Sequence, residues 1–268
     1  MTYRSALSIA LTSICVLLLF LQESSSSTNP YLHIYKTGTR FSLTVRWWGL
    51  SATGTMEVLE NTESSGKDAI LVRSHVTKLG GFLGFIVKFL RMYKKSNTFD
   101  SYIDPETFMA MRYEVYQLND DGSMELTEHI YFDRELNKVV SLVDNETIIS
   151  DTSSDIQDAF SVFLNLLCRV NTEELSVGKE FELNLYAYRK AFKVEIDVTR
   201  LLLTGSKTIY TLEIEELPAM FKYPASLSFE VTDVEGLKLP IAGKCIIHVP
   251  VLPDITIDGE FTEIKCAS

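Results

Sequence analysis

The stretch SYIDPETFMAMRYEVYQLNDDG, Ser101–Gly122, is bounded by two turn signals that predict a β-hairpin. Asp104-Pro105 marks a tight turn at its start, and Asp121-Gly122 is typical of a two-residue hairpin loop. Such a loop pairs residues whose numbers add up to 243 with the returning strand SMELTEHIYFD. This register predicts one apolar, core-facing side made of Met109, Met111, Tyr113 and Val115 with Leu126, Ile130 and Phe132.

The opposite face of this hairpin carries the candidate polar site. The register pairs Arg112 with Tyr131, Glu114 with His129, and Tyr116 with Thr127. Two interpretations are open for this face. It is either an outer surface with ordinary cross-strand partners, or the lining of a wet pocket in which Glu114 and His129 form a coupled acid–base pair.

Alternation of apolar and polar residues continues along most of the chain and predicts a mainly β protein. Examples are the runs Phe41–Trp47, Phe192–Val198 and Leu227–Val231, each followed or preceded by Gly, Ser or Asp turn signals. One buried and one wet face per strand is the habit of antiparallel sheets. We expect about a dozen strands in a strongly curved antiparallel sheet or a partly open β-barrel.

Two segments break the alternation and predict helices packed against the sheet. SSDIQDAFSVFLNLLCRV, with a cap at Ser154 or Asp155, has the apolar spacing of an amphipathic helix lying on the sheet. GGFLGFIVKFLRMYKK, residues 80–95, predicts a short apolar helix with a basic end. It closes the apolar end of the sheet, lies in a membrane interface, or caps the mouth of a lipid-holding barrel. In the last case Phe82, Phe85 and Phe89 are candidate ligand-binding residues.

The N-terminus predicts export. Residues 1–26 combine Arg4, an apolar run from Ala6 to Leu21 and several small residues, the pattern of a cleaved secretory signal peptide. The apolar run is shorter than the roughly 20 residues of a membrane-spanning helix, so a signal anchor is less favoured. We expect residues 27–268 to form a single β-rich domain, with two lobes (about 30–150 and 151–268) as the alternative, in the periplasm or outside the cell.

Composition and motifs argue against several functions. A net charge of −11 and a pI near 4.9 disfavour nucleic-acid binding. The sequence lacks metal-binding spacing, phosphate loops and nucleophile elbows, and its four histidines are scattered, so we expect neither cofactor nor metal nor catalysis. Cys245 and Cys266 flank a predicted C-terminal hairpin; they either form a disulfide or are small buried apolar side chains.

Several blocks carry a resemblance to a known family. RFSLTVRWWGLSATGTMEVLE, SYIDPETFMAMRYE, DIQDAFSVFLNLL with LSVGKEFELNLY, and LSFEVTDVEGLKLPIAGK follow one another as in DUF3108, an exported bacterial family of unknown function. The resemblance spans about Arg40 to Phe261. The chain departs from it at Ala110 or Met111, where the family often has Pro, and at Glu230, where it has Trp. It implies an exported β-rich domain, such as a bent sheet wrapping a helix, and no activity.

These features favour a non-catalytic protein of the cell envelope that binds a lipid or another hydrophobic small molecule. Trp47 and Trp48 point to opposite faces of a strand, so one belongs to the core and the other, for which we take Trp48, is free to line a rim. Arg112, Glu114, His129 and Tyr131 are further candidate ligand-binding residues, and residues 80–95 are candidates for membrane contact. The alternatives are a structural or interaction component with an envelope protein partner, and a glycan-binding module that uses Trp48 as a platform.

Overall fold

The computed structural model describes residues 30–47, 50–80, 97–119, 121–143, 146–172, 176–187, 190–205, 207–214, 225–234, 236–248 and 254–266. Its helices are α2 (Pro30–Ile34) and α4 (Ala159–Asn171). Its strands are β1 (Arg40–Trp47), β2 (Leu50–Ser64), β3 (Lys67–Gly80), β4 (Asn97–Ile103), β5 (Ala110–Leu118), β6 (Met124–Asp133), β7 (Lys138–Val143), β8 (Glu146–Asp151), β9 (Glu180–Ala187), β10 (Lys190–Thr204), β11 (Lys207–Ile214), β12 (Ala225–Val234), β13 (Leu237–Ile247) and β14 (Ile255–Lys265).

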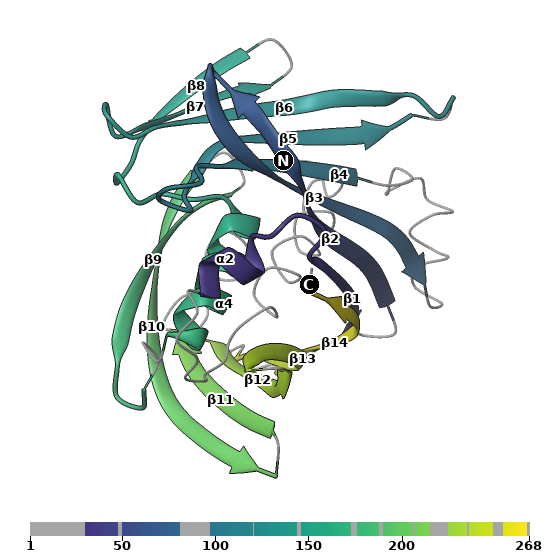
Figure 1. Cartoon of the computed structure of the whole chain (residues 1–268), viewed down its shortest axis with the longest axis vertical. Helices are drawn as coiled ribbons and strands as arrows, with labels where there is room; N and C mark the ends of the chain where they lie inside the picture. The colour runs from purple at the N-terminus through teal and green to yellow at the C-terminus, as the bar shows by residue number, and fades with distance from the viewer. Residues whose placement is uncertain are drawn as a thin grey trace.

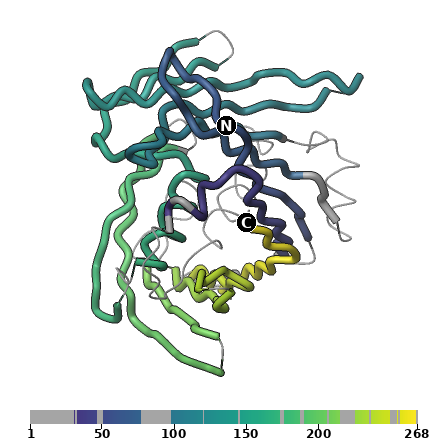
Figure 2. Tube along the Cα trace, viewed as in Figure 1, coloured from purple at the N-terminus to yellow at the C-terminus, as the bar shows by residue number. Residues whose placement is uncertain are grey.

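The strands form one antiparallel sheet, as the alternation predicts. The described strands are ordered β8-β7-β6-β5-β4-β3-β2-β1-β14-β13-β12-β11-β10-β9. Two meanders are therefore joined where the first strand pairs with the last, and Figure 2 shows these purple and yellow segments side by side. The sheet is strongly curved but not closed, because its edge strands β8 and β9 do not pair with each other.

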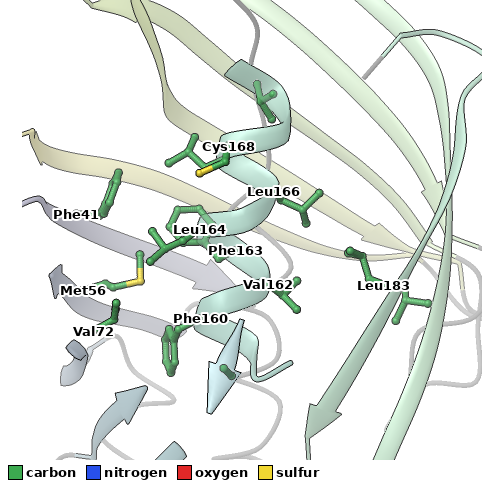
Figure 3. Packing of buried hydrophobic residues seen from close by; sticks show 14 of the residues in the cluster. Phe41, Met56, Val72, Phe160, Val162, Phe163, Leu164, Leu166, Cys168 and Leu183 are labelled. Carbon is green, nitrogen blue, oxygen red and sulfur yellow. The ribbon is translucent and has the colours of Figure 1, made fainter. Parts of the chain in front are cut away.

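Helix α4 lies on the concave side of the sheet and is buried all round. Twelve of its thirteen residues are buried, with Arg169 as the exception. Val162 and Leu166 point towards Leu183 of β9, on the side away from Phe41 of β1 (Figure 3). The prediction of an amphipathic helix was therefore wrong in one respect: the curved sheet covers the side expected to face solvent (Figure 1).

The start of α4 also differs from the prediction. The N-cap is Asp158, whose side chain accepts hydrogen bonds from the N–H groups of Phe160 and Ser161. Ser154 and Asp155 lie in a turn before it, and Gln157 forms an isolated bridge with β9. Because the backbone of Gln157 pairs with this distant strand, the helix begins later in the chain than predicted. Local capping signals do not reveal such a pairing.

The hairpin register was predicted correctly over half its length. Arg112 pairs with Tyr131 and Glu114 with His129. A bulge after Val115 then shifts the pairing, so that Tyr116 faces Leu126 rather than Thr127. The loop is longer than predicted, since Asn119 pairs with Ser123 and Gly122 has a φ of 88°. A three-residue loop with a left-handed glycine thus replaces the two-residue loop.

The bulge also changes which side chains reach the core. Tyr113, Ile130 and Phe132 are buried as predicted, and Val115 packs partly against them. Leu126 is instead 45% exposed, because a one-residue shift moves a side chain to the other face of the sheet. Met109 precedes β5 and, like Met111, is half-buried.

Other predictions lie partly or wholly outside the described residues. The predicted signal peptide and residues 81–95 of the second predicted helix fall there, and residue 80 ends strand β3. Among the described residues, no helix is long and apolar enough to cross a membrane.

The predicted disulfide between Cys245 and Cys266 is not formed. Cys245 is buried in β13 and pairs with Ile257 of β14, whereas Cys266 follows the far end of β14. Nine residues of strand separate the two positions along β14, which corresponds to roughly 30 Å. The register of β13 and β14 therefore keeps the two thiols apart.

Burial on every side of α4 can be tested with two leucines that lie next to each other in sequence. Both Leu166 and Leu167 are fully buried. The helical spacing in the sequence includes only Leu167, since its apolar residues are Ile156, Phe160, Phe163, Leu164 and Leu167. We expect Leu166→Ala and Leu167→Ala each to lower the free energy of unfolding by about 2–5 kcal/mol in urea. An almost neutral Leu166→Ala beside a costly Leu167→Ala would show that α4 has one wet side.

Candidate functional site

A polar cluster anchors α4 to the stretch that begins at Ser101. In the Asp104-Pro105 turn, Asp104 Oδ1 accepts backbone hydrogen bonds of 2.8 and 3.0 Å from residues 106 and 107. The chain then reaches Phe108, which has a φ of 55°, a conformation that is costly for a bulky residue. Its ring lies between those of Tyr31 and Tyr35, with centroids 4.7 and 4.9 Å away. Local contacts with α2 and its C-terminal end thus hold this strained residue.

Asn165 of α4 is the centre of this inner polar cluster. Its amide nitrogen donates to the carbonyl oxygen of Phe108 at 2.7 Å and to Gln157 Oε1 at 2.6 Å. Its amide oxygen accepts a hydrogen bond of 2.8 Å from the Tyr35 hydroxyl. One buried side chain therefore links α4 to α2, to the Asp104 turn and to the segment that precedes the helix. Burial raises the pKa of Tyr35 well above its ordinary value, so this hydroxyl stays a donor.

The N-terminus of α4 is fixed by a second buried contact. Asp158 Oδ2 accepts a hydrogen bond of 2.6 Å from Ser101 Oγ of β4, while Oδ1 caps the helix. Burial raises the pKa of Asp158, and the hydrogen bonds from Ser101 and the helix oppose that shift. The carboxylate gains from the partial positive charge of the helix N-terminus, which makes this buried acid a structural anchor.

The two edge strands of the sheet, β8 and β9, are separated by a gap that is called the seam here. A strap, residues 152–157, crosses it. Gln157 donates its N–H to the carbonyl of Asn184 at 3.0 Å, and Tyr186 donates its N–H to the carbonyl of Gln157 at 2.8 Å. The Asn184 side chain also donates to Asp155, at 3.0 and 2.9 Å from its two carboxylate oxygens. A few hydrogen bonds therefore join the edges where other neighbours share a full ladder.

The predicted polar face of the hairpin forms a compact cluster around Glu114. This buried carboxylate accepts hydrogen bonds from Tyr102 and Tyr116 at 3.0 and 2.7 Å. Arg112 Nε and His129 Nε2 lie 3.4 and 3.3 Å from its other oxygen. The structure thus brings together Arg112, Glu114 and His129, and Tyr131 stacks on His129 with ring centroids 4.3 Å apart.

This Glu114 cluster lies on the outer face of the sheet, away from α4. The neighbouring residues Tyr113 and Ile130 belong to the core, so alternation turns Glu114 and His129 outwards. Next to them, buried Asp100 makes two hydrogen bonds of 2.7 Å with Arg73 of β3. The acid groups are thus engaged by their own neighbours, which favours the interpretation as ordinary cross-strand partners.

Burial governs the titration of His129. It lowers the pKa of the imidazole below 6.5, the nearby Glu114 carboxylate raises that pKa, and Arg112 lowers it again. His129 is therefore mostly neutral at pH 7, so its contact with Glu114 is not an ion pair at that pH. Among the described residues, no group of three His, Cys, Asp or Glu side chains is arranged to hold a metal ion.

Sequence patterns did not reveal a further polar cluster on β11 to β14. Ser226 Oγ lies 2.7 Å from Glu213 Oε2 and 2.9 Å from His248 Nε2, and His248 Nδ1 lies 3.2 Å from Asp254 Oδ2. These distances resemble a Ser-His-Asp triad. However, Glu213 competes for the serine proton, and Ser226 is paired on both sides, with Glu213 and Ile246. Its strand N–H groups belong to ladders and are not positioned as an oxyanion hole.

The remaining predicted ligand-binding residues are Trp48, Phe82, Phe85 and Phe89. They lie outside the described residues, and their role stays a prediction.

The sequence of this chain matches the model of one protein family. The model of DUF3108, a protein family of unknown function, matches residues 40–242, most of the chain. The chain belongs to the DUF3108 family. The match includes the Asp104 turn, the strap and all of α4, and therefore every part of the inner polar cluster of this DUF3108 protein except Tyr35.

Solved structures match the chain only at low sequence identity and with TM-scores below 0.5. A β-barrel-like DUF1849 protein from Brucella abortus is 10% identical, with a TM-score of 0.45, covering 86% of this chain and 97% of that one. The hypothetical protein CT021 from Chlamydia trachomatis is 9% identical, with a TM-score of 0.30, covering 90% of this chain and 95% of that one. No curated protein matches the sequence of this chain.

A magnetic resonance titration of the His129 ring tests the outer cluster. We expect a pKa below 6.5, a further decrease in Glu114→Gln and an increase in Arg112→Met. Because the unfolded chain takes up this proton more readily, His129 supports folding above pH 6.5 and loses that support as the pH falls through its lower folded value. A His129 pKa that equals the ordinary 6.5 and stays unchanged in both variants would contradict the geometry of the cluster.

Proposed function

We propose that this DUF3108 protein is an exported, non-catalytic protein of the cell envelope that binds a lipid or another hydrophobic molecule. Its binding site is the inner face of the sheet, the side that carries α4. The observation that carries this proposal is an open sheet of 14 strands whose concave side is lined by apolar side chains. Large curved sheets of this type hold hydrophobic ligands on that side.

The chemistry of the inner face supports an apolar ligand. The inward residues of β10 to β13 are apolar and buried: Ile196, Val198, Tyr210, Leu212, Ile214, Ala225, Leu227, Phe229, Val231, Cys245 and Ile247. Helix α4 packs against α2 and, among the strands, mainly against β4, β9 and β13. An apolar molecule that entered the inner face would meet side chains of β11 and β12 that are almost entirely hydrocarbon, and burial of its surface among them would stabilise binding.

The polar clusters support a binding rather than a catalytic role. Glu114 and Asp100 are engaged by their own neighbours, and Ser226 lacks a suitable oxyanion hole within the described strands. The inner cluster around Asn165 consists of hydrogen bonds between groups of the protein itself. Export is supported by the sequence pattern of residues 1–26.

A second candidate function, docking of an envelope protein, is supported by apolar side chains on the outer face. Leu126, Leu142 and Ile149 are 45%, 40% and 60% exposed on β6, β7 and β8. Alternation and register place all three on the outer face. Edge strands with exposed apolar side chains favour association.

Mass spectrometry of the purified full chain tests the ligand proposal. We expect organic extracts to contain one defined class of hydrophobic molecule, and a dansyl fatty acid to bind the delipidated protein. Ala225→Met, which adds bulk to the inner face of β12, should weaken probe binding about tenfold. The matched outer-face variant Ser228→Met should bind as the wild type does.

Urea unfolding of both variants separates loss of binding from loss of folding. A protein that carries no extractable ligand and fails to bind the probe while folded would contradict the proposal. The purified protein could instead carry no ligand but form complexes with another protein. If Ile149→Asp abolished these complexes, the result would support docking of an envelope protein.

A further inference from the structure

We infer that the strap, residues 152–157, is a gate through which a hydrophobic ligand reaches the inner face of the sheet. This inference rests on the proposed function and names the route of access to the same site. It starts from the junction of the described sheet that has the fewest backbone pairs, the seam between β8 and β9. There, one isolated bridge at Gln157 and Leu185 replaces the ladder of six or more residue pairs that joins other neighbouring strands.

The strap separates solvent from the apolar interior. Ile156 is 3% exposed and belongs to the core, whereas Ser154 and Asp155, just before it, are exposed. Moving the strap outwards would withdraw Ile156 and uncover the apolar side chains next to the β9 edge. An apolar ligand could then enter without breaking any ladder between the 14 strands.

The two ends of the strap are better fixed than its centre. At one end, Thr152 donates its N–H to the carbonyl of Asn137 at 2.9 Å. At the other end, Asp158 is buried and bound to Ser101 as well as to the N-terminus of α4. The central contact between Asp155 and Asn184 is exposed, so water can replace it at little cost. This arrangement lets residues 153–157 move, with loss of the Gln157 contact to Asn165, while Asp158 and the other two partners of Asn165 keep α4 in place.

Arg134, in the turn between β6 and β7, acts as the latch. Its guanidinium donates to the carbonyl oxygens of Ala110 at 2.6 Å and of Ile156 at 3.1 Å, and also to that of Ser154. These hydrogen bonds connect the strap to β5. The three acceptors are neutral carbonyl groups. Burial lowers the pKa of Arg134, and the nearby carboxylates of Asp104, Asp155 and Asp158 oppose that shift. A partly desolvated cation that hydrogen-bonds to carbonyls recovers its hydration when the strap opens.

The proposed opening has both costs and gains in free energy, and one cost is the hydrogen bond that Gln157 Oε1 accepts from Asn165. Opening breaks the hydrogen bonds of Arg134, Gln157 and Asn184, exposes Ile156, and returns a charged side chain to water. If the strap only closed the sheet permanently, apolar packing or a β-ladder would hold it more firmly than these contacts do. The combination of a short backbone junction and a charged latch is suited to reversible opening.

A reversible cross-link across the seam provides the test. The full chain carries Cys15→Ser and Cys266→Ser, so that the remaining native thiols, Cys168 and Cys245, are buried. Asp155→Cys with Asn184→Cys places two thiols across the seam, to be joined by a short bis-thiosulfonate reagent. The control pair, Arg46→Cys with Glu260→Cys, replaces an exposed ion pair of 2.9 Å between β1 and β14.

We expect the seam cross-link to slow association and dissociation of a dansyl fatty acid about tenfold, and reduction to restore both rates. The control cross-link should leave the rates unchanged. Arg134→Met, which removes the latch but keeps an unbranched side chain, should accelerate both rates. Probe kinetics that are identical with and without the seam cross-link would overturn the gate.

Hydrogen exchange of backbone amides tests the opening of the strap without any ligand. In wild type, the N–H groups of Gln157 and Tyr186 should exchange through local opening, about tenfold or more faster than those of the β1–β14 ladder. The seam cross-link should remove this difference. Exchange of these two amides only with global unfolding would overturn the gate, whereas failure of every variant to bind the probe would count against the proposed function alone.

Discussion

The hydrogen bonds of Asn165 are the constraint on which the arrangement of this protein depends. A helix surrounded by apolar side chains can slide or rotate with little change in hydrophobic burial, but a buried amide must keep its partners. Asn165 has such partners in the Phe108 carbonyl, the Tyr35 hydroxyl and Gln157. Because these groups belong to separate elements, one position of α4 satisfies all of them together.

The open sheet follows from the same anchoring. Asp158 and Asn165 hold α4 against β4 and the Asp104 turn, and the strap leads directly into this helix. The segment that connects β8 to α4 therefore occupies the seam, where a closed barrel would have a ladder between β8 and β9. In the proposed function this departure from closure gives an apolar ligand a route to the concave face.

Much of the fold could be predicted from local patterns in the sequence, because alternation and turn residues act over short distances. They gave the antiparallel sheet, the existence of α4 and the pairing of Glu114 with His129. The bulge after Val115 was missed, since no turn residue marks it. The cap at Asp158 was missed because Gln157 pairs with a strand almost 30 residues further along the chain.

The candidate sites were harder to predict because they depend on contacts between distant segments. The register identified Arg112, Glu114, His129 and Tyr131 as neighbours, but only the position of α4 shows that they face outwards. The three carbonyl partners of Arg134 and the contacts of Ser226 with His248 have no local signal. Backbone acceptors in particular leave no trace in the residue types of a sequence.

Urea unfolding of Asn165→Leu tests the central role of this amide most directly. The substitution keeps a similar volume and adds apolar surface, while leaving three buried hydrogen-bonding groups without their partner. The same substitution at exposed Asn61 of β2 is the control, with an expected change within about 0.5 kcal/mol. We predict that Asn165→Leu lowers the free energy of unfolding by about 3 kcal/mol. A variant as stable as the wild type, or more stable, would contradict the account.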